Sequence, residues 1–443
     1  MIDQLRVASY NVPVVYTPDV CVIGGGAAGI AATAGASRSG LSVLLIEKYG
    51  FCGGAAVAGL SGTICGLFSS GSDPKQIVFG FADEFYKMLQ RNGGVTEPVR
   101  FGRTLLVPHD GMRWKEAADE LIGSLNCRML FHTCFLKAVT GENGEIEYLI
   151  VKGGEGEFAI RPKYVIDASG DAEVVNSTSY PFSIGDNGIV QTPTMIFKMA
   201  NVQMSSFLSF NPQDIAQKIL EANLSGKYIL PRQHVYLFPS PNTGEVLCNM
   251  TKITYPDGSV PLGIDSKDIT YAEIEGRKQA RAYASFLVNE IPGFQNAYLA
   301  DTATQVGIRQ TRSVAGLGTL RNSDILTGVK SVHSVTLSAW PIELHAAGNL
   351  KIAYLEDDYY DIPFETLIPV HSTNLLVAGR CLSAEHEALA SARVTAQCLG
   401  MGYAAGAACS LMLSEKIPAN RLTGYDVATW MKHKKLKTSY ESA

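Results

Sequence analysis

The sequence predicts an α/β protein whose parallel sheet is interrupted by an inserted α+β unit. Two short apolar runs near the N-terminus flank a glycine cluster and an alanine-rich stretch, the strand–helix–strand pattern of a parallel sheet. A similar run returns near residue 375, whereas the chain between about 193 and 305 is polar and rich in proline. A chain of 443 residues suits two or three packing units. We assign 1–190 and 306–443 to the α/β domain and 191–305 to the insertion.

The composition is that of a globular chain with a small net negative charge. Hydrophobic residues make up 46% and charged residues 18%, which excludes a disordered or coiled-coil protein. The 37 basic and 42 acidic residues give a net charge of −5, so no nucleic-acid partner is expected. Nine cysteines occur without a C-x-x-C pair, and we expect no metal site, no disulfide framework and a cytoplasmic location.

The first strand–helix–strand unit occupies residues 19–47. Val20–Ile23 is a continuous apolar run, as in a strand that is buried on both faces. Ala27–Ser39 is rich in helix-favouring alanine and is followed by a glycine that suits a helix end. Ser42–Ile46 forms the second strand, and Glu47 follows at its tip.

Further elements follow from the spacing of apolar residues. The spacing predicts helices over 79–90, 112–125 and 267–290, and strands over 127–138, 147–152, 164–168 and 374–378. Val394–Leu413 is a stretch of twenty residues without a charge, which is long enough to span a membrane. Because it consists mostly of small residues, we predict a buried helix and no membrane span.

The glycine cluster has the spacing of a dinucleotide-binding loop. Gly24, Gly26 and Gly29 satisfy G-x-G-x-x-G between the first strand and its helix. These glycines permit a tight turn, close approach of a pyrophosphate and close packing of helix on strand. The helix N-terminus offers N–H donors to the phosphates. Glu47, 23 residues after Gly24, is placed to accept hydrogen bonds from ribose hydroxyls, which favours FAD or NAD over NADP.

Four segments carry motifs of a known family. They are 22–29 with Glu47-Lys48 and the paired glycines of 50–55; 165–171, which ends in Ser-Gly-Asp; 272–277 with 307–312; and 362–380 with the helix that follows. Together they resemble the FAD-dependent oxidoreductase family of the glutathione-reductase-like FAD-binding superfamily. Gln310 departs from the family's usual Arg-Glu-Ser-Arg. The resemblance covers nearly the whole chain.

The resemblance implies a Rossmann-like FAD-binding domain, with a three-stranded β addition to its parallel sheet, and an inserted cap domain for the substrate. It implies FAD as the cofactor, held along its full length. The residues implied in FAD binding are Gly24, Gly26, Ala27, Ala28, Gly29, Glu47, Lys48, Gly53, Gly54, Ala55, Phe135, Ala168, Gly170, Asp171, Gly379 and Arg380.

A flavin enzyme also needs a proton carrier and groups that stabilise charge on the flavin. Arg393 lies in a nearly uncharged stretch, so if buried it needs a partner: the flavin, an anionic substrate, Glu385 or Glu387. His386 stands between these two acids, which we expect to raise its pKa. It suits a proton carrier or a surface histidine equally well. We expect this segment to continue into the small-residue helix.

His345 and Arg309 complete the catalytic candidates. His345 ends a Pro-Ile-Glu-Leu-His segment, where related sequences tend to carry Pro-x-Asp-x-His. Arg309 and Arg312 are three positions apart and are expected on one helical face. There they would hold a carboxylate or phosphate of the substrate, or tie the cap to the body. Cys52 and Cys65 are thirteen positions apart, which is too far for the cysteine pair of a disulfide reductase.

We predict a hydride transfer between a small polar organic substrate and flavin N5, in a direction that the sequence leaves open. An NAD-dependent dehydrogenase and a non-catalytic FAD-binding protein for assembly or sensing are the alternatives. The expected partner is a small-molecule substrate, and homo-oligomerisation stays open.

Overall fold

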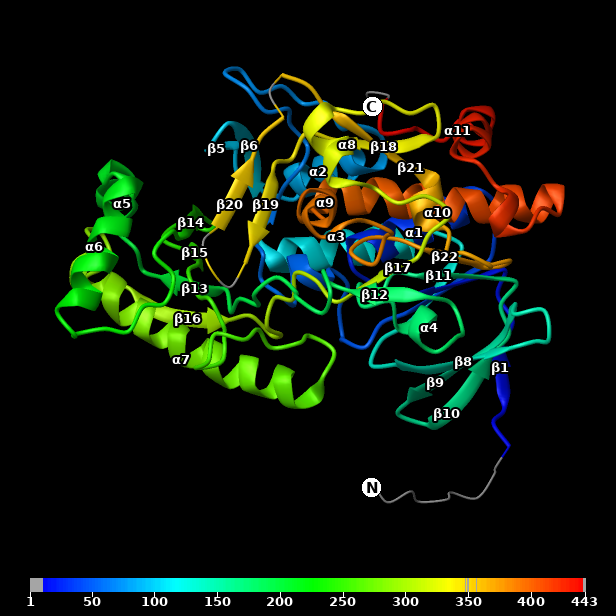
Figure 1. The fold of residues 1–443 in the computed structure, drawn as a ribbon, viewed down its shortest axis with the longest axis horizontal. Helices are drawn as coiled ribbons and strands as arrows, with labels where there is room; N and C mark the ends of the chain where they lie inside the picture. Colours follow the sequence, from blue (N-terminus) through cyan, green and yellow to red (C-terminus); the bar gives the residue numbers. More distant parts are fainter. Residues whose placement is uncertain (1–10, 347, 349, 356, 441–443) are drawn as a thin grey trace.

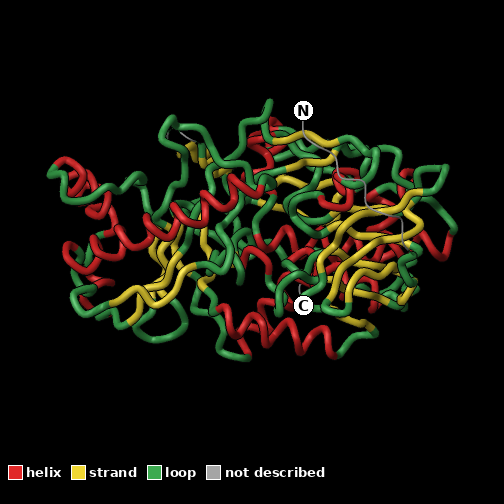
Figure 2. The backbone as a smooth tube through the Cα atoms, turned by 90° about the horizontal axis from the view of Figure 1, so that it is seen from below, coloured by secondary structure: helices red, strands yellow, loops and turns green. Residues whose placement is uncertain are grey.

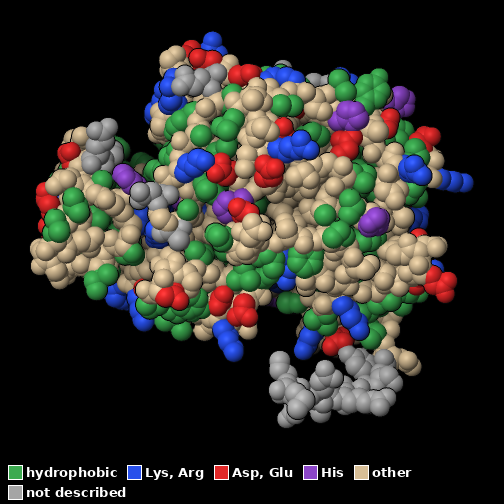
Figure 3. All heavy atoms as spheres, in the orientation of Figure 1, with side chains coloured by type: hydrophobic (Ala, Val, Ile, Leu, Met, Phe, Trp, Pro, Cys, Tyr) green, Lys and Arg blue, Asp and Glu red, His purple; other side chains and the backbone are tan. Residues whose placement is uncertain are grey.

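In the computed structural model, residues 11–346, 348, 350–355 and 357–440 are described. A large α/β body carries a smaller lobe at one side (Figure 1). The strands of the body and of the lobe form separate groups (Figure 2). On the face drawn in Figure 3, basic and acidic side chains are mixed.

A five-stranded parallel sheet forms the centre of the body, in the order β22-β11-β2-β3-β7. Val20 and Val22 belong to the core beneath helix α1 (Ala27–Arg38), whereas Cys21 and Ile23 belong to a second core on the opposite face. Burial on both faces explains why these strands are continuous apolar runs. The strands are β2 (Val20–Ile23), β3 (Val43–Ile46), β7 (Cys127–Leu130), β11 (Tyr164–Asp167) and β22 (Leu375–Val377).

A second sheet covers one face of the parallel sheet. Its order is β1-β10-β9-β8, with β1 (Val14–Tyr16), β8 (Cys134–Thr140), β9 (Ile146–Gly153) and β10 (Gly156–Ile160). The resemblance implied a three-stranded addition to the parallel sheet, and this expectation is wrong. The second sheet has four strands, because β1 pairs in parallel with β10. The single strand predicted over 127–138 is also wrong. His132 has a φ of +50° in the turn between β7 and β8, which belong to different sheets.

Helices cover the other face of the parallel sheet. They are α1 (Ala27–Arg38), α2 (Gly80–Arg91), α3 (Gly111–Gly123) and α10 (Thr395–Glu415). Among the described residues, α10 is the one helix long and apolar enough to cross a membrane, and 94% of its most apolar stretch is buried inside the protein. It is the predicted buried helix. The segment before it does not continue into it: α9 (His386–Ala392) is separate, and Val394 has an extended backbone with ψ of 166°.

The contact between α1 and α10 depends on glycine. A Cβ on Gly402 would lie 2.0 Å from the Ala28 carbonyl oxygen, and one on Gly406 would lie 2.1 Å from the Ala32 carbonyl oxygen. From the α1 side, a Cβ on Gly35 would lie 2.2 Å from the Tyr403 carbonyl oxygen. Since real side chains never approach this closely, the two backbones can touch only at these glycines.

The smaller lobe has an antiparallel sheet in the order β14-β15-β13-β16 and a hydrophobic core of its own. Its elements are β13 (Phe197–Ala200), α5 (Met204–Ser209), α6 (Pro212–Leu224), β14 (Tyr236–Pro239), β15 (Val246–Asn249), α7 (Ser266–Glu290) and β16 (Tyr298–Thr302). Asp265 caps α7 by accepting hydrogen bonds from the Lys267 and Asp268 amides. The domain limits at 190/191 and 305/306 stay predictions.

The remaining elements connect these layers. The short sheets are β4-β6-β5, β12-β17, β18-β21 and β19-β20. Their strands are β4 (Thr63–Ile64), β5 (Val99–Phe101), β6 (Thr104–Pro108), β12 (Phe182–Ile184), β17 (Arg312–Val314), β18 (Ser334–Ser338), β19 (Ile342–His345), β20 (Leu350–Ala353) and β21 (Tyr360–Pro363). The remaining α-helices are α4 (Glu173–Asn176), α8 (Asn322–Thr327) and α11 (Gly424–His433).

Replacing Gly406 with valine should destabilise the protein by at least about 2 kcal/mol, because the side chain forces α1 and α10 apart. Urea unfolding followed by circular dichroism measures the change. Gly123→Ala is the matched control: nothing lies within 4 Å of its added Cβ, so this helix should keep or gain stability. A Gly406→Val variant as stable as the control would contradict the packing described above.

Candidate functional site

A cavity of about 450 Å³ opens between the ends of the central strands, the N-termini of α1 and α10, and the smaller lobe. It brings together residues that lie far apart in the sequence. Among the predicted site residues, those that line it are Gly24, Gly26, Ala27, Ala28, Glu47, Lys48, Gly53, Gly54, Ala55, Phe135, Ala168, Gly170, Asp171, Arg309, His345, Gly379, Arg380 and Arg393. Gly29 and His386 are not part of this lining.

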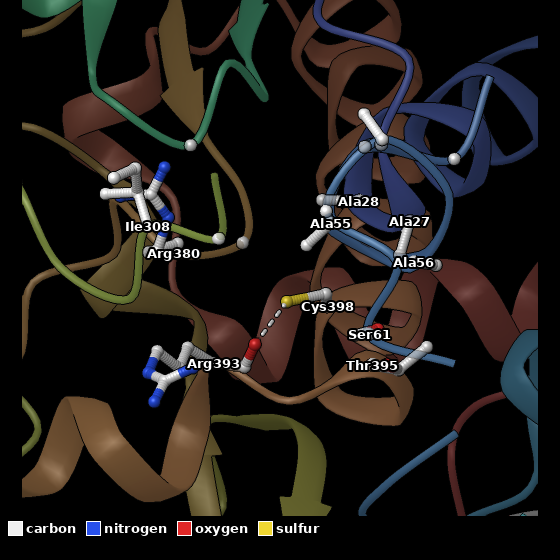
Figure 4. A pocket seen from close by; sticks show the side chains of 18 of the residues that line it. Ala27, Ala28, Ala55, Ala56, Ser61, Ile308, Arg380, Arg393, Thr395 and Cys398 are labelled. Carbon is white, nitrogen blue, oxygen red and sulfur yellow. Dashed lines mark hydrogen bonds between the residues drawn. The ribbon is translucent and has the colours of Figure 1, made fainter. Parts of the chain in front are cut away.

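The glycine loop forms a bare backbone wall of the cavity. Gly24 has a φ of +98°, and a Cβ there would lie 2.6 Å from the Ala168 carbonyl oxygen. Gly53 donates a backbone hydrogen bond to the Gly25 carbonyl (2.8 Å), and a Cβ on Gly54 would lie 2.9 Å from Gly26 Cα. Small alanine side chains continue this wall, across the pocket from Arg380 and Arg393 (Figure 4).

The first turn of α1 opens into the cavity without a cap. Gly26 is the N-cap residue, no side chain caps the helix, and the first turn contains no acidic residue. The free N–H groups and the helix dipole make such an end a site for phosphate groups. Gly29 lies behind this turn, where a Cβ would lie 1.7 Å from the Gly24 carbonyl oxygen. Its place is in the packing of the helix against the loop.

Glu47 lies beside the glycine loop and is only 5% exposed. Its carboxylate accepts hydrogen bonds from the backbone amides of Gly25 (2.6 Å) and Tyr49 (2.8 Å). Burial raises the pKa of this carboxyl group, although the two amides and Lys48 oppose the rise. Each oxygen keeps a further lone pair for a ligand hydroxyl.

Asp171 and Arg380 form an ion pair of 2.7 Å where the ends of β11 and β22 meet. Thr311 donates a second hydrogen bond to Asp171 (2.8 Å). A Cβ on Gly170 would lie 3.1 Å from the Arg380 guanidinium, so glycine leaves room for the arginine. The two charges compensate each other at this end of the cavity.

The N-terminus of α10 also opens into the cavity. Val394 is its N-cap residue, with no side-chain cap and no acidic residue in the first turn. The Ala396 amide donates to the Cys65 carbonyl (3.1 Å). Arg393 precedes this end, and its guanidinium donates to Gln191 (3.2 Å), while its Nε has no partner among the residues that the structure describes. Burial lowers the pKa of Arg393 to about 10.

His345, Glu343 and Arg309 lie together at this end. Burial and the charge of Arg309 lower the pKa of His345 to about 3. The ring is therefore neutral at pH 7, and its Nε2 donates to Glu343 Oε1 (3.1 Å). Glu343 stays ionised: although burial favours its neutral form, His345 and the arginines hold its pKa below the usual value. A smaller cavity of about 190 Å³ shares Arg309 and His345 with the first.

Two expectations about charged residues are wrong. Arg309 lies outside the helices and strands and Arg312 lies in β17, so they share no helical face. Burial lowers the pKa of His386, although Asp186 and Glu387 oppose it. The carboxylates near His386 are engaged elsewhere: Glu385 accepts from the Asn322 amide, and Glu387 pairs with Lys351 at 2.7 Å. Neither is the partner of Arg393 within the described part of the chain.

Several lining residues were missed from the sequence. Glu343 is two positions before His345 on β19, so strand alternation would have placed both on one face. Tyr236, Asn249 and Trp340 had no local signal, because they reach the cavity only through tertiary packing.

The cysteine thiols at the cavity are protonated. Cys65 and Cys398 line it, and burial raises the pKa of each to about 12. Cys52, which lies outside the lining, is fully buried with its Sγ 3.7 Å from Met129 Sδ. A thiolate nucleophile is therefore not formed at neutral pH by these residues.

Solved structures of other proteins resemble this chain at low sequence identity. A geranylgeranyl bacteriochlorophyll reductase-like protein from Thermoplasma acidophilum is similar, with a TM-score of 0.48 and 13% identity over 96% of this chain and 84% of that one. p-Nitrophenol 4-monooxygenase PnpA from Pseudomonas putida DLL-E4 has a TM-score of 0.47 and 12% identity over 96% and 87%. No curated protein matches.

The model of the FAD dependent oxidoreductase family matches residues 19–431, almost the entire chain. This family uses FAD, which argues against the NAD-dependent alternative. The uncapped helix ends and the bare glycine wall fit such a cofactor. The chain belongs to the FAD-dependent oxidoreductase family, and FAD is its cofactor.

Proposed function

We propose that FAD lies in the large cavity and that a small polar organic substrate exchanges a hydride with its N5 beside Arg309, His345 and Arg393. The observation that carries this proposal is that two long helices, α1 and α10, both open without caps into one cavity. One end suits a diphosphate, and the other, beside Arg393, suits the electron-rich edge of a flavin ring.

The lining residues divide into groups along the proposed cofactor. Gly24, Gly26, Ala27 and Ala28 would hold the diphosphate at the N-terminus of α1. Glu47, Lys48 and Phe135 would contact the adenosine half, with Ala168, Gly170 and Asp171 beside them. Gly53, Gly54, Ala55, Gly379 and Arg380 would contact the flavin half, where the absence of large side chains lets a planar ring approach the backbone.

When bound, FAD supplies the atom that accepts or gives the hydride. The protein supplies the accompanying proton transfer. Neutral His345 can accept a proton because its Nε2 hydrogen is committed to Glu343, which leaves Nδ1 unprotonated. The Glu343 carboxylate then stabilises the imidazolium that forms. Trp340 and Tyr236 line this end of the cavity with aromatic rings.

The smaller lobe supplies part of the substrate end. Tyr236, Phe238 and Asn249 reach the cavity from β14 and β15, and Gly307, Ile308 and Arg309 follow β16. We propose that the lobe is the cap and that the substrate binds where cap and body meet, since such junctions favour clefts.

Anaerobic mixing tests the reaction and its direction. The oxidised protein is mixed with small hydroxy acids, amino acids and amines, and the dithionite-reduced protein with fumarate and cinnamate. Loss of the yellow flavin colour with one of the hydroxy acids, amino acids or amines supports the proposal. Recovery of the colour when fumarate or cinnamate is added to the reduced protein also supports it. A yellow protein inert in both series would point instead to the non-catalytic role.

Replacing Glu47 with alanine should weaken FAD binding at least about tenfold, because it removes a charged acceptor at the adenosine end. Reconstitution of apoprotein with FAD, followed by flavin fluorescence, measures the dissociation constant. Glu116→Ala removes an exposed carboxylate on α3 and serves as the control. Equal affinity in the two variants would remove Glu47 from the site.

The pH profile should show that His345 is neutral in the free enzyme. Its pKa of about 3 lies below the tested range, so the base form dominates throughout. With the first active compound of the panel, the second-order rate constant for flavin reduction should be flat from about pH 5 to about pH 8. His345→Gln should lower this rate constant across the range. An inflection near the ordinary histidine pKa that disappears in this variant would show that the ring titrates normally.

A further inference from the structure

We propose that the substrate is an organic carboxylate with a planar apolar body, held by Arg309 and Arg393 against an aromatic wall. This inference rests on the proposed function and specifies its substrate class. It follows from the charge and the shape of the end of the cavity that lies beside α10.

Positive charge exceeds negative charge at this end. Arg309 and Arg393 line the large cavity, and Arg232 lines the smaller cavity that shares Arg309 with it. The three lie close enough to affect the ionisation of one another or of Glu343. Among the described residues, Glu343 is the one carboxylate near them, and its hydrogen-bond partner is His345. Because His345 is neutral, three guanidinium groups face one carboxylate, which leaves two positive charges uncompensated. An enclosed surplus of this kind is costly unless an anion enters.

Polar contacts hold the arginines without neutralising them. Arg309 donates to the Thr192 carbonyl (2.5 Å) and Arg393 to the side-chain oxygen of Gln191 (3.2 Å). Arg232 donates to Asn249 (2.8 Å). Within the described ranges, no Asp or Glu oxygen forms an ion pair with any of the three. The adjacent residues 191 and 192 thus fix two guanidinium groups beside the same space.

Unused donors remain on these arginines. The Nε of Arg393 and an Nη of Arg232 are buried and have no partner among the described residues. Burial, together with the charges of Arg232 and Arg393, pushes the pKa of Arg309 well below its ordinary value. Each of these costs would fall if a carboxylate bound to the guanidinium groups, because it supplies both acceptors and opposite charge.

The cofactor does not account for the surplus. The diphosphate is assigned to the N-terminus of α1, at the opposite part of the site, where Arg380 already pairs with Asp171. The isoalloxazine ring carries no net charge when oxidised. The oxidised protein with FAD bound therefore retains both uncompensated charges for the substrate.

The aromatic wall indicates the shape of the substrate body. The rings of Phe101 and Trp340 are stacked, 10° from parallel with centroids 5.3 Å apart. Tyr236 lies 5.0 Å from Phe101, and all three rings line the cavity. Arg232 lies over the Tyr236 ring at 5.2 Å, which joins the wall to the cationic cluster. A flat apolar body with a carboxylate at one end matches this combination.

The test uses the purified protein with FAD bound and two probes of equal size, benzoate and neutral benzamide. Each probe is titrated while the visible spectrum of the flavin is recorded. Benzoate should bind at least tenfold more tightly than benzamide. Arg309→Met and Arg393→Met should each weaken benzoate binding at least tenfold with benzamide binding unchanged, and Arg309→Met should also leave the FAD content unchanged. Arg281→Met removes an exposed arginine of α7 and should leave the benzoate affinity unchanged.

The outcomes distinguish a failure of the carboxylate assignment from a failure of the proposed FAD-dependent function. Equal affinity for benzoate and benzamide in a yellow protein overturns the carboxylate assignment and leaves the FAD proposal intact. Inorganic phosphate that binds as tightly as benzoate also overturns it, because a planar body would then contribute nothing. Loss of FAD from the wild-type protein argues against the proposed function itself. Where a methionine variant fails to fold, Arg309→Lys keeps the charge and should retain part of the preference for benzoate.

Discussion

The backbone contact between α1 and α10 is the constraint on which the site depends. Gly35, Gly402 and Gly406 let the two helices touch, and both helices run back from the same cavity with their N-termini toward it. Each N-terminus carries a partial positive charge and N–H groups that have no acceptor within the helix itself. The packing of these two helices, which consist largely of small residues, therefore places two N-termini that favour anions in one site. No charged side chain is needed to form either end.

The charged residues then distinguish the two ends of the cavity. Near the parallel sheet, Asp171 neutralises Arg380, and Glu47 is tied to the glycine loop. Beside the smaller lobe, arginines outnumber carboxylates, and burial and Arg309 keep His345 neutral. A cofactor that brings its own negative diphosphate suits the first end. A reaction that needs anion binding and proton transfer suits the second.

The sequence predicted the parts of the fold that are encoded locally. Val20–Ile23, the glycine loop and the helix after it form one continuous pattern, and α10 was visible as an uncharged stretch of small residues. The break between α9 and α10 was not predictable, because neither Arg393 nor Val394 is a helix breaker. There the chain turns to place the α10 N-terminus at the cavity, where the Cys65 carbonyl accepts the Ala396 amide. The fourth strand, β1, was missed because its three residues are too short for a periodic signal.

The sequence predicted which residues belong to the site better than it predicted how they are arranged. His345, Arg309 and Arg393 were singled out individually, but their assembly depends on residues 191 and 192, which carry no motif. Arg232 and the aromatic wall come from separate elements and meet only in the folded protein. The lowered pKa of His386 and the neutrality of His345 depend on burial, and burial cannot be predicted from the residues adjacent in the sequence.

A crystal structure of the protein with FAD bound tests the central claim most directly. The account predicts electron density for the diphosphate over the first turn of α1, against Gly24 and Gly26, with the flavin ring reaching toward the N-terminus of α10. Density for the diphosphate at any other place, with the glycine loop in contact only with protein, would contradict it.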